Sequence, residues 1–441
     1  MQQYISFFTS QRQKIDESCA PLVNAFREKA FETFQRTGFP AYKSEDYQHT
    51  DIAGLLKADF GFYLNRSGAE INPHKVFYCN VPNLHSYKHF VVNGHFYEEK
   101  IATDLPQGVF SGGLNTFAKQ YPQIFSRYYN QQAGEKGDGL AAFNTMFVQD
   151  GYVLYVPENV VIEKAIQLTN ISGGTIDSLV NRRILIILEP GAQAKLLVCD
   201  HTTDEHSTLA ATQVVEIYAG EKASFDFYEL EESSLNTIRL TANFVQQAAS
   251  SSVIAHTITL SNGITRNNYR VDLNGQQAET HLYGMAIVDV QQKIDNFTLL
   301  NHRVPDGHSK ELFKYVLDDE AIGTFSGRII VEKDAQKTEA YQNNRNLLGS
   351  SDCRMFSKPQ LEIYADDVKC SHGMSTGQLD EAALFYMRSR GIPMEEAVLL
   401  LKFAFTIDVI QGIRLEGLRD RLKLLIEKRF RGDLIKCQGC I

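Results

Sequence analysis

The sequence lacks the short motifs that mark many enzyme active sites. It contains no Gly-x-x-x-x-Gly-Lys-Ser/Thr phosphate-binding loop, no His-Glu-x-x-His and no Gly-x-Ser-x-Gly elbow. The pair Gly173-Gly174 follows a strand-like run but has no third glycine, so it indicates a turn rather than a dinucleotide fingerprint. Any nucleotide that this protein uses should therefore be held by another subunit.

Segments for export and membrane insertion are also missing. Residues 1–14 never form the run of about 7–15 apolar residues that a secretory signal needs. The most apolar window, residues 397–410, is interrupted by Lys402 and Asp408 and is shorter than the ~20 residues of a membrane span. We therefore expect a cytoplasmic protein.

The charge balance disfavours two classes of partner. The chain has 44 Lys and Arg against 53 Asp and Glu, a net charge of −9. A surface of that sign repels phosphate backbones and anionic lipids. We expect neither nucleic acid nor membrane as the main partner.

The chain divides into three regions by hydrophobic pattern. Residues 1–105 predict a small helical or mixed domain, with a helix over 20–36 that ends at Gly38 and Pro40. Residues 106–370 are dominated by short β-branched runs, at 152–156, 160–162, 184–188, 195–198, 214–218 and 224–230. Residues 371–441 predict a compact helical domain. The fold class is therefore mainly β, with helical regions at both ends.

A repeat in the β region favours a solenoid. The segment 191–196 (GAQAKL) resembles 220–225 (GEKASF), 29 residues later, and Ala249, Ser252 and Ile254 mark a weaker third copy. Strands and tight turns of small residues at a fixed period are typical of coils that stack on one another. This predicts a parallel β-helix with Leu196 and Phe225 pointing into its interior. A β-sandwich or barrel with similar hairpins is the alternative.

Helical periodicity returns after Cys370. Thr376 is a plausible N-cap for the first helix, Gly391 ends it, and Pro393 opens the next. Residues 394–409 are apolar nearly all round, which predicts a helix that is buried or covered by a partner. A third helix is expected over 413–430.

Cys370 and His372 form the densest group of metal-binding side chains. On a strand, residues two apart share a face, so the thiolate and the imidazole could bind iron together. Alternatively, Cys370 packs in the last coil and His372 orients the following helix. Two ligands do not complete a site, so a metal site here would need ligands from a partner chain.

The other candidate groups have ordinary explanations. The chain has seven cysteines, an odd number, and no export signal, so we expect reduced thiols. Cys437 and Cys440 form a Cys-x-x-Cys at the terminus, where a mobile tail is the preferred interpretation. Simple exposed or solvated positions are expected for a second set: Cys353, His302, His308 and the acidic turn 318–320.

A long segment resembles a known family. Residues 369–392 (KCSHGMSTGQLDEAALFYMRSRGI) closely resemble the C-terminal signature of the SufB/SufD family of iron-sulfur cluster assembly proteins. Further matching segments occur in order: 43–50 (KSEDYQHT), 155–164 (YVPENVVIEK), 325–329 (FSGRI) and 342–347 (QNNRNL). The Cys-Ser-His-Gly form and the separate N-terminal element are closer to the SufD branch. Tyr47 stands where the family usually has Trp, and Met374 and Thr376 replace commoner small or apolar residues.

The resemblance implies a fold, partners and a site. It implies a right-handed parallel β-helix between two helical regions, paired with a SufB-like subunit through the β-helix ends. It also implies that the C-terminal helical domain docks a SufC-like ATPase, so that ATP enters only through that partner. A transient iron-sulfur cluster would form at the junction, with His372 as a ligand and Cys370 beside it. The resemblance leaves open whether the complex binds a flavin and whether the chain alone forms a homodimer.

The resulting prediction is a non-catalytic scaffold subunit for iron-sulfur cluster assembly. A β-helix lyase or hydrolase acting on polysaccharide is the alternative from another class. The chain shows no ladder of Asp or Glu that such an enzyme would carry on its outer face. A homodimeric interaction protein is a third alternative.

Overall fold

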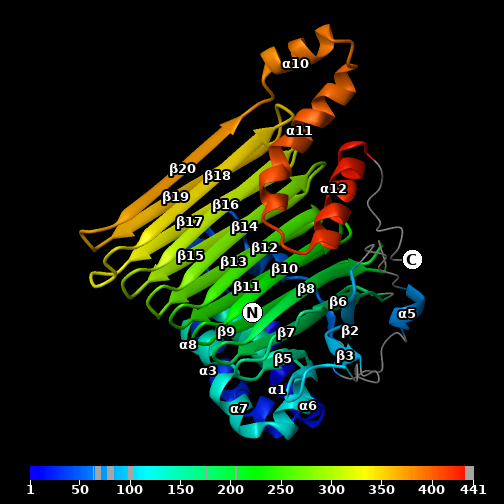
Figure 1. Ribbon diagram of the computed structural model, residues 1–441. Coiled ribbons are helices and arrows are strands. Elements are labelled where there is room, and N and C mark those ends of the chain that lie inside the picture. Colours follow the sequence, from blue (N-terminus) through cyan, green and yellow to red (C-terminus); the bar gives the residue numbers. More distant parts are fainter. Residues whose placement is uncertain are drawn as a thin grey trace.

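The computed structural model describes residues 1–62, 64, 71–76, 84–97, 104–174, 176–203 and 206–432. The centre of the molecule consists of two long sheets that face each other and together form a parallel β-solenoid (Figure 1). The predicted fold class is thus confirmed. Along the solenoid, consecutive strands of the chain alternate between the two sheets. The chain therefore coils from one sheet to the other and back.

The first sheet contains β4 and the odd-numbered strands from β5 to β19. Its members are β4 (Phe110–Gly113), β5 (Tyr152–Val156), β7 (Ser178–Leu188), β9 (Leu209–Ala219), β11 (Thr237–Gln247), β13 (Ile264–Leu273), β15 (Lys293–His302), β17 (Ile322–Val331) and β19 (Arg354–Ile363), with the short β1 (Gly61–Phe62) beside β7.

The second sheet contains β2, β3 and the even-numbered strands from β6 to β20. Its members are β2 (Ser86–Val92), β3 (His95–Tyr97), β6 (Ala165–Ser172), β8 (Gln193–Thr202), β10 (Ser224–Glu232), β12 (Ser252–Ser261), β14 (Glu279–Val288), β16 (His308–Leu317), β18 (Glu339–Leu348) and β20 (Lys369–Gly377).

The coils do not keep one fixed length. Successive strands of the second sheet place Gln193 beside Ser224, 31 residues on, and Ser224 beside Ser252, 28 residues on. Phe225 is therefore in register with Ala194 and Val253, rather than with Leu196 and Ile254 as the 29-residue period predicts. Leu196 lies two residues from the partner of Phe225 and therefore stays on the inward face. Ile254 lies one residue from the partner of Phe225 and therefore lies on the opposite face.

The interior between the sheets contains an apolar core together with buried charged side chains. Its core includes Leu196, Phe225, Phe227 and Val253. A buried ionic cluster lies among them: Arg239 bonds Asp200 at 2.5 Å and Glu229 at 3.0 Å, and Arg182 bonds Asp200 at 2.7 Å. Because each charge of this cluster has an opposite charge as partner, the interior tolerates it.

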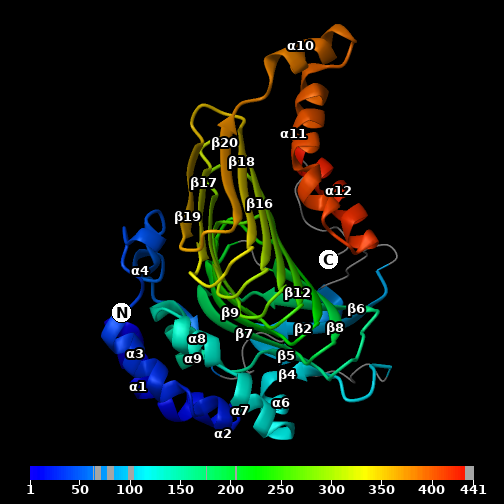
Figure 2. The ribbon, with the colours of Figure 1, turned by 60° about the vertical axis from the view of Figure 1, so that its left-hand side comes forward.

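The N-terminal part surrounds one end of the solenoid (Figure 2). Its helices are α1 (Gln2–Glu17), α2 (Pro21–Asn24), α3 (Arg27–Thr37), the 3-10 helix η1 (Glu45–Tyr47), α4 (Ile52–Leu55), α5 (Pro73–Val76), α6 (Leu114–Gln120), α7 (Pro122–Tyr128), α8 (Gln131–Lys136) and α9 (Gly139–Phe147). The helix predicted over 20–36 is thus two helices. The expected domain boundary at residue 105 has a strand of the second sheet, β2, before it and the helices α6–α9 after it.

The C-terminal helices are α10 (Glu381–Ser389), α11 (Met394–Gln411) and α12 (Glu416–Phe430). α11 and α12 pack on the outer face of the second sheet, while α10 projects beyond its end (Figures 1 and 2). Ion pairs fix this packing: Lys402 bonds Asp318 at 2.7 Å and Arg429 bonds Asp289 at 2.5 Å. No helix among the described residues is both long and apolar enough to cross a membrane.

Two local predictions were wrong. Residues 160–162 contribute only an isolated bridge at Val161 rather than a strand. Thr376 lies inside β20, and Asp380 is the N-cap of α10, where its carboxylate accepts the backbone N–H of Ala382 at 2.8 Å. The β20 strand continues past residue 370 because it pairs with β18 as far as Gly377.

Candidate functional site

The last coil of the solenoid presents two open strand edges. β19 and β20 are the final strands of their sheets, and no other described strand pairs with their outer edges. Figure 2 shows β20 at the rim, with the chain running on from its end to α10. An unpaired edge of this length exposes backbone N–H and C=O groups that can pair with another chain.

Cys370 and His372 lie on the inward-facing row of β20. They are in register with Ala340 and Gln342 of β18, both fully buried in the interior. Met374 and Thr376 continue the row above Asn344 and Asn346. The Cys370 and His372 side chains therefore share one face, as their spacing predicted. That face lines the open end of the solenoid at its last coil, which we call the mouth.

The two side chains differ in exposure. Cys370 is half-buried and packs against the apolar interior, and burial raises the pKa of its thiol. His372 is exposed at the rim. The imidazole is therefore the more accessible of the two ligands, whereas Cys370 must lose a proton from a partly apolar setting to bind metal.

Two ligands on one strand do not form a complete metal site. Within the described part of the chain, no group of three or more His, Cys, Asp or Glu side chains is arranged to hold a metal ion. The positions of Cys370 and His372 are about 6.6 Å apart along the strand, given the rise of two residues in a parallel strand. A metal or cluster held here would thus need ligands from outside this chain.

The element at residues 43–50 forms one wall beside the mouth. Glu45 bonds both Lys358 and Arg328 at 3.1 Å, and His49 stacks on Phe356 with ring centroids 4.2 Å apart. The hydrogen bond from Lys358 is the main cause that lowers the pKa of Glu45. A hollow of about 360 Å³ separates this wall from Met374 of β20.

Tyr47 anchors the same element to the solenoid. Its ring lies under the Arg266 guanidinium, 4.0 Å from the ring centroid, and its hydroxyl accepts a hydrogen bond from Asn268 at 3.1 Å. The sequence singled out this segment but did not place it near β19 and β20. The contacts of this segment with β19 join residues some 300 positions apart, and short-range periodicity carries no signal for them.

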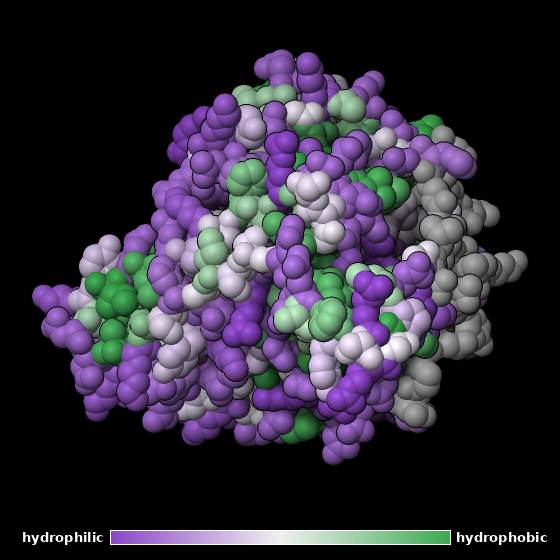
Figure 3. All heavy atoms as spheres, turned by 90° about the horizontal axis from the view of Figure 1, so that it is seen from above, coloured by the Kyte–Doolittle hydropathy of each residue, from purple (hydrophilic) through white to green (hydrophobic). Residues whose placement is uncertain are grey.

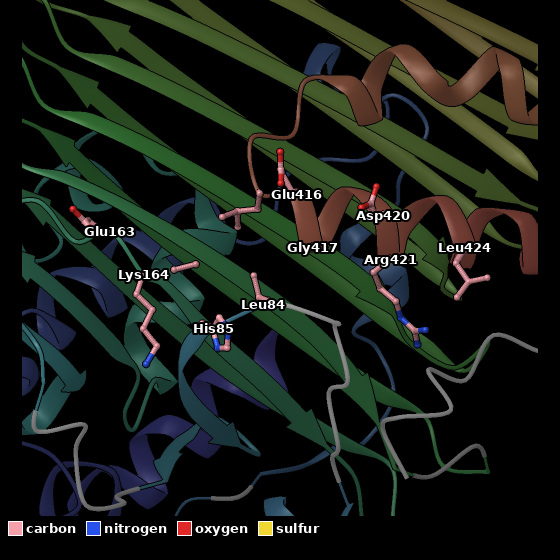
Figure 4. Close-up of a pocket in the computed structure, with 11 residues that line it drawn as sticks. Leu84, His85, Glu163, Lys164, Glu416, Gly417, Asp420, Arg421 and Leu424 are labelled. Carbon is pink, nitrogen blue, oxygen red and sulfur yellow. The ribbon is translucent and has the colours of Figure 1, made fainter.

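A larger hollow lies away from β20. It has a volume of about 650 Å³ and separates the start of the solenoid from α12 (Figure 4). Lys164 and His85 line one side, and Glu416 and Asp420 the other. Its mixed charges select no single class of ligand, and neither Cys370 nor His372 lines it.

Several groups predicted to be exposed are buried or engaged. Cys353 and His302 are buried, and the His302 ring bonds the Ser309 hydroxyl at 2.8 Å. Asp318 holds Lys402 of α11, so this part of the acidic turn has a structural contact. His308 is exposed as expected. Cys79, Cys437 and Cys440 lie outside the described residues.

The C-terminal helices expose a second candidate surface. α10 has no buried residue, and its Phe385 and Tyr386 are 75% and 59% exposed. α11 buries Ala397, Leu399, Thr406, Val409 and Ile410 but leaves Leu400 40% exposed, so the solenoid covers only part of the apolar helix. Seen from above, this side of the molecule has green hydrophobic patches among purple hydrophilic side chains (Figure 3).

The fold and the end strand define a parallel β-solenoid protein with a thiol and an imidazole at the mouth of its last coil. Residues 170–405 match the family model described as "SUF system FeS cluster assembly, SufBD core domain", and residues 1–168 match the "SufBD protein N-terminal region". The chain belongs to the SufBD family and has a role in iron-sulfur cluster assembly.

Individual relatives agree with this assignment. The chain is 28% identical to an iron-sulfur cluster assembly SufBD family protein of Synechocystis over 422 residues, 92% of this chain and 91% of that protein. It is 34% identical to the iron-sulfur cluster assembly protein SufD of Escherichia coli over 185 residues, 42% of this chain and 44% of that protein. It is 26% identical to SufD of Bacillus subtilis over 329 residues, 73% of this chain and 74% of that protein.

Proposed function

We propose that this chain is a non-catalytic scaffold subunit that helps to hold an iron-sulfur cluster during its assembly. The observation that carries the proposal is the exposed His372 on the inward row of the last strand, with Cys370 beside it. The cluster is cargo: it forms at this mouth and then leaves for a recipient protein. Because the chain offers two ligands there, the cluster is shared with a second protein.

That second protein is a SufB-like subunit that continues the solenoid. The open edges of β19 and β20 offer backbone hydrogen bonds, and the side chains near them are partly apolar. Met374 is 53% exposed on the inward row, and Ile363 is 40% exposed at the end of β19. A partner that pairs with both edges would cover these side chains and bring its own ligands opposite His372.

The C-terminal helices dock a SufC-like ATPase. Exposed aromatic side chains on a projecting helix are typical of an interface anchor, and Phe385 and Tyr386 fill that role on α10. α11 is tied to the solenoid through Lys402 and Asp318, and through Lys314 and Asp408 at 2.7 Å. Movement of the ATPase would therefore be transmitted to β16 and the neighbouring coils. ATP enters the complex only through that partner.

The test is reconstitution of the complex with and without His372. The chain is co-expressed with SufB-like and SufC-like subunits, purified, and loaded anaerobically with iron and sulfide while the cluster absorbance is recorded. His372→Ala should keep the complex intact and abolish most of the absorbance. Ser371→Ala, an exposed neighbour on the opposite face of β20, is the matched control and should keep it. Equal absorbance in both variants would refute the role of His372.

A homodimer is the second candidate, because the same two edges could pair with a second copy of this chain. Sedimentation of the purified chain with and without the SufB-like subunit separates the two assemblies. A homodimer that persists when the SufB-like subunit is added in excess would contradict the scaffold proposal. Cleavage of pectin-type polysaccharide by the purified chain would instead support the enzyme alternative.

A further inference from the structure

Three side chains form a line that leads from the interior to the mouth of the solenoid. Glu311 of β16 is in register with Gln342 of β18, and Gln342 is in register with His372 of β20. Glu311 and Gln342 are both fully buried, whereas His372 lies at the rim. The buried part of this line is polar although the neighbouring inward positions Ala340 and Phe313 are apolar.

The amide of Gln342 is only half satisfied. Its Nε2 donates a hydrogen bond to the Glu311 carboxylate, one coil deeper. Its Oε1 is buried and has no hydrogen-bond partner among the described residues. Leaving such an oxygen unpaired costs about 1–3 kcal/mol, so a buried unpaired carbonyl beside a candidate site calls for a ligand.

The surroundings fix which way this amide points. Gly327, on the opposite sheet, leaves the space that Gln342 occupies: a Cβ there would lie only 2.4 Å from Nε2. The Glu311 carboxyl group accepts the Gln342 N–H from the neighbouring coil. With Nε2 directed to the deeper coil, Oε1 is the amide atom left to face the coil that carries His372.

We propose that Gln342 is a positioning residue for His372, and that Glu311 fixes the direction of Gln342. The Oε1 atom of Gln342 would accept the N–H of one His372 ring nitrogen, which leaves the other nitrogen directed out of the mouth toward the cluster. Histidines that bind metals almost always donate their second ring N–H to a carbonyl, a carboxylate or water, which fixes the tautomer and the ring orientation. This inference rests on the proposed function, because it assigns His372 a metal-binding nitrogen.

The alternative is that Gln342 and Glu311 serve packing alone. Gln342→Met keeps the length of the side chain but removes both hydrogen-bonding atoms. The double substitution Gln342→Glu with Glu311→Gln exchanges the two groups, so that position 342 still presents an accepting oxygen to His372 and is still held from the deeper coil. Thr376→Val changes another side chain of the same inward row, which bonds Asn346 at 3.0 Å, and is the matched control.

The first measurement is cluster retention in the reconstituted complex, challenged with an iron chelator. Gln342→Met should release the cluster about 10- to 100-fold faster, the range found when the partner of a metal-bound histidine is removed. The exchanged double variant should recover most of the loss, and Thr376→Val should match the wild type. Retention by Gln342→Met at the wild-type rate would overturn the proposal. Should Gln342→Met fail to fold or to pair, failure of the double variant to retain the cluster would overturn it equally.

The second measurement does not depend on a cluster. In the chain labelled with ¹⁵N-histidine, the ring ¹⁵N shifts of His372 report its tautomer, and the His372→Ala spectrum assigns the signal. One tautomer should predominate in the wild type, and Gln342→Met should give a mixture. Unchanged ring shifts would overturn the proposal even if His372→Ala loses the cluster. If Gln342→Met changes the ring shifts but His372→Ala still holds the cluster, the contact between Gln342 and His372 is supported and the proposed function is refuted instead.

Discussion

Glu311→Gln should remove a pH-dependent loss of stability from the solenoid. The Glu311 carboxyl group is fully buried, and burial raises its pKa from an ordinary value of 4.5 to about 7. Between these values the folded protein keeps a proton that the unfolded chain releases, so the free energy of unfolding falls as the pH rises. One pKa unit equals about 1.4 kcal/mol, so the full effect is about 3 kcal/mol.

The assay is urea unfolding followed by circular dichroism at pH 4.5, 6 and 7.5. Relative to Glu311→Gln, the wild type should lose about 3 kcal/mol of unfolding free energy between the lowest and the highest pH. Glu158→Gln, at an exposed position, is the control and should keep the wild-type pH dependence. A constant difference between wild type and Glu311→Gln across this range would refute the reasoning that burial governs the Glu311 proton.

Three further changes probe the interior, the helices and the mouth. Arg239→Met leaves Asp200 and Glu229 without a shared cation, so it should lower the free energy of unfolding by about 3–5 kcal/mol in the same urea assay. Phe385→Ala should weaken capture of the SufC-like ATPase at least about 10-fold by surface plasmon resonance while the melting temperature stays the same, because the ring is exposed. Met374→Lys should weaken pairing with the SufB-like subunit, measured by sedimentation, without unfolding the chain; equal affinity would exclude the inward row from the interface.

Local patterns predicted much of the architecture. Short β-branched runs located five of the solenoid strands, β5, β7, β8, β9 and β10, and Gly391 ends α10 in the left-handed conformation that favours glycine. Periodicity also placed the region's inward face correctly at Leu196 and Phe225. It failed at Ile254, because the coil length varies between neighbouring turns and one residue reverses the face.

The candidate site was only partly predictable. The spacing of Cys370 and His372 predicted a shared face, but Thr376 was assigned to the wrong element, since its strand conformation depends on pairing with Asn346, 30 residues earlier. His302 and Cys353 were expected at the surface because their neighbours are polar and turn-rich. Both are buried because the adjacent coils cover them.

By itself the sequence determined that the chain coils into a β-solenoid, that helices flank it, and that a thiol and an imidazole stand two residues apart where it ends. These features depend on side chains close in sequence: alternation within a strand, small residues at a corner, and one short motif. Only the tertiary structure decided that His372 lies at an exposed mouth, above Gln342 and Glu311, and beside the wall formed by residues 43–50. Those relations join residues about 30 to 300 positions apart, and they exist only once the coils have stacked in register.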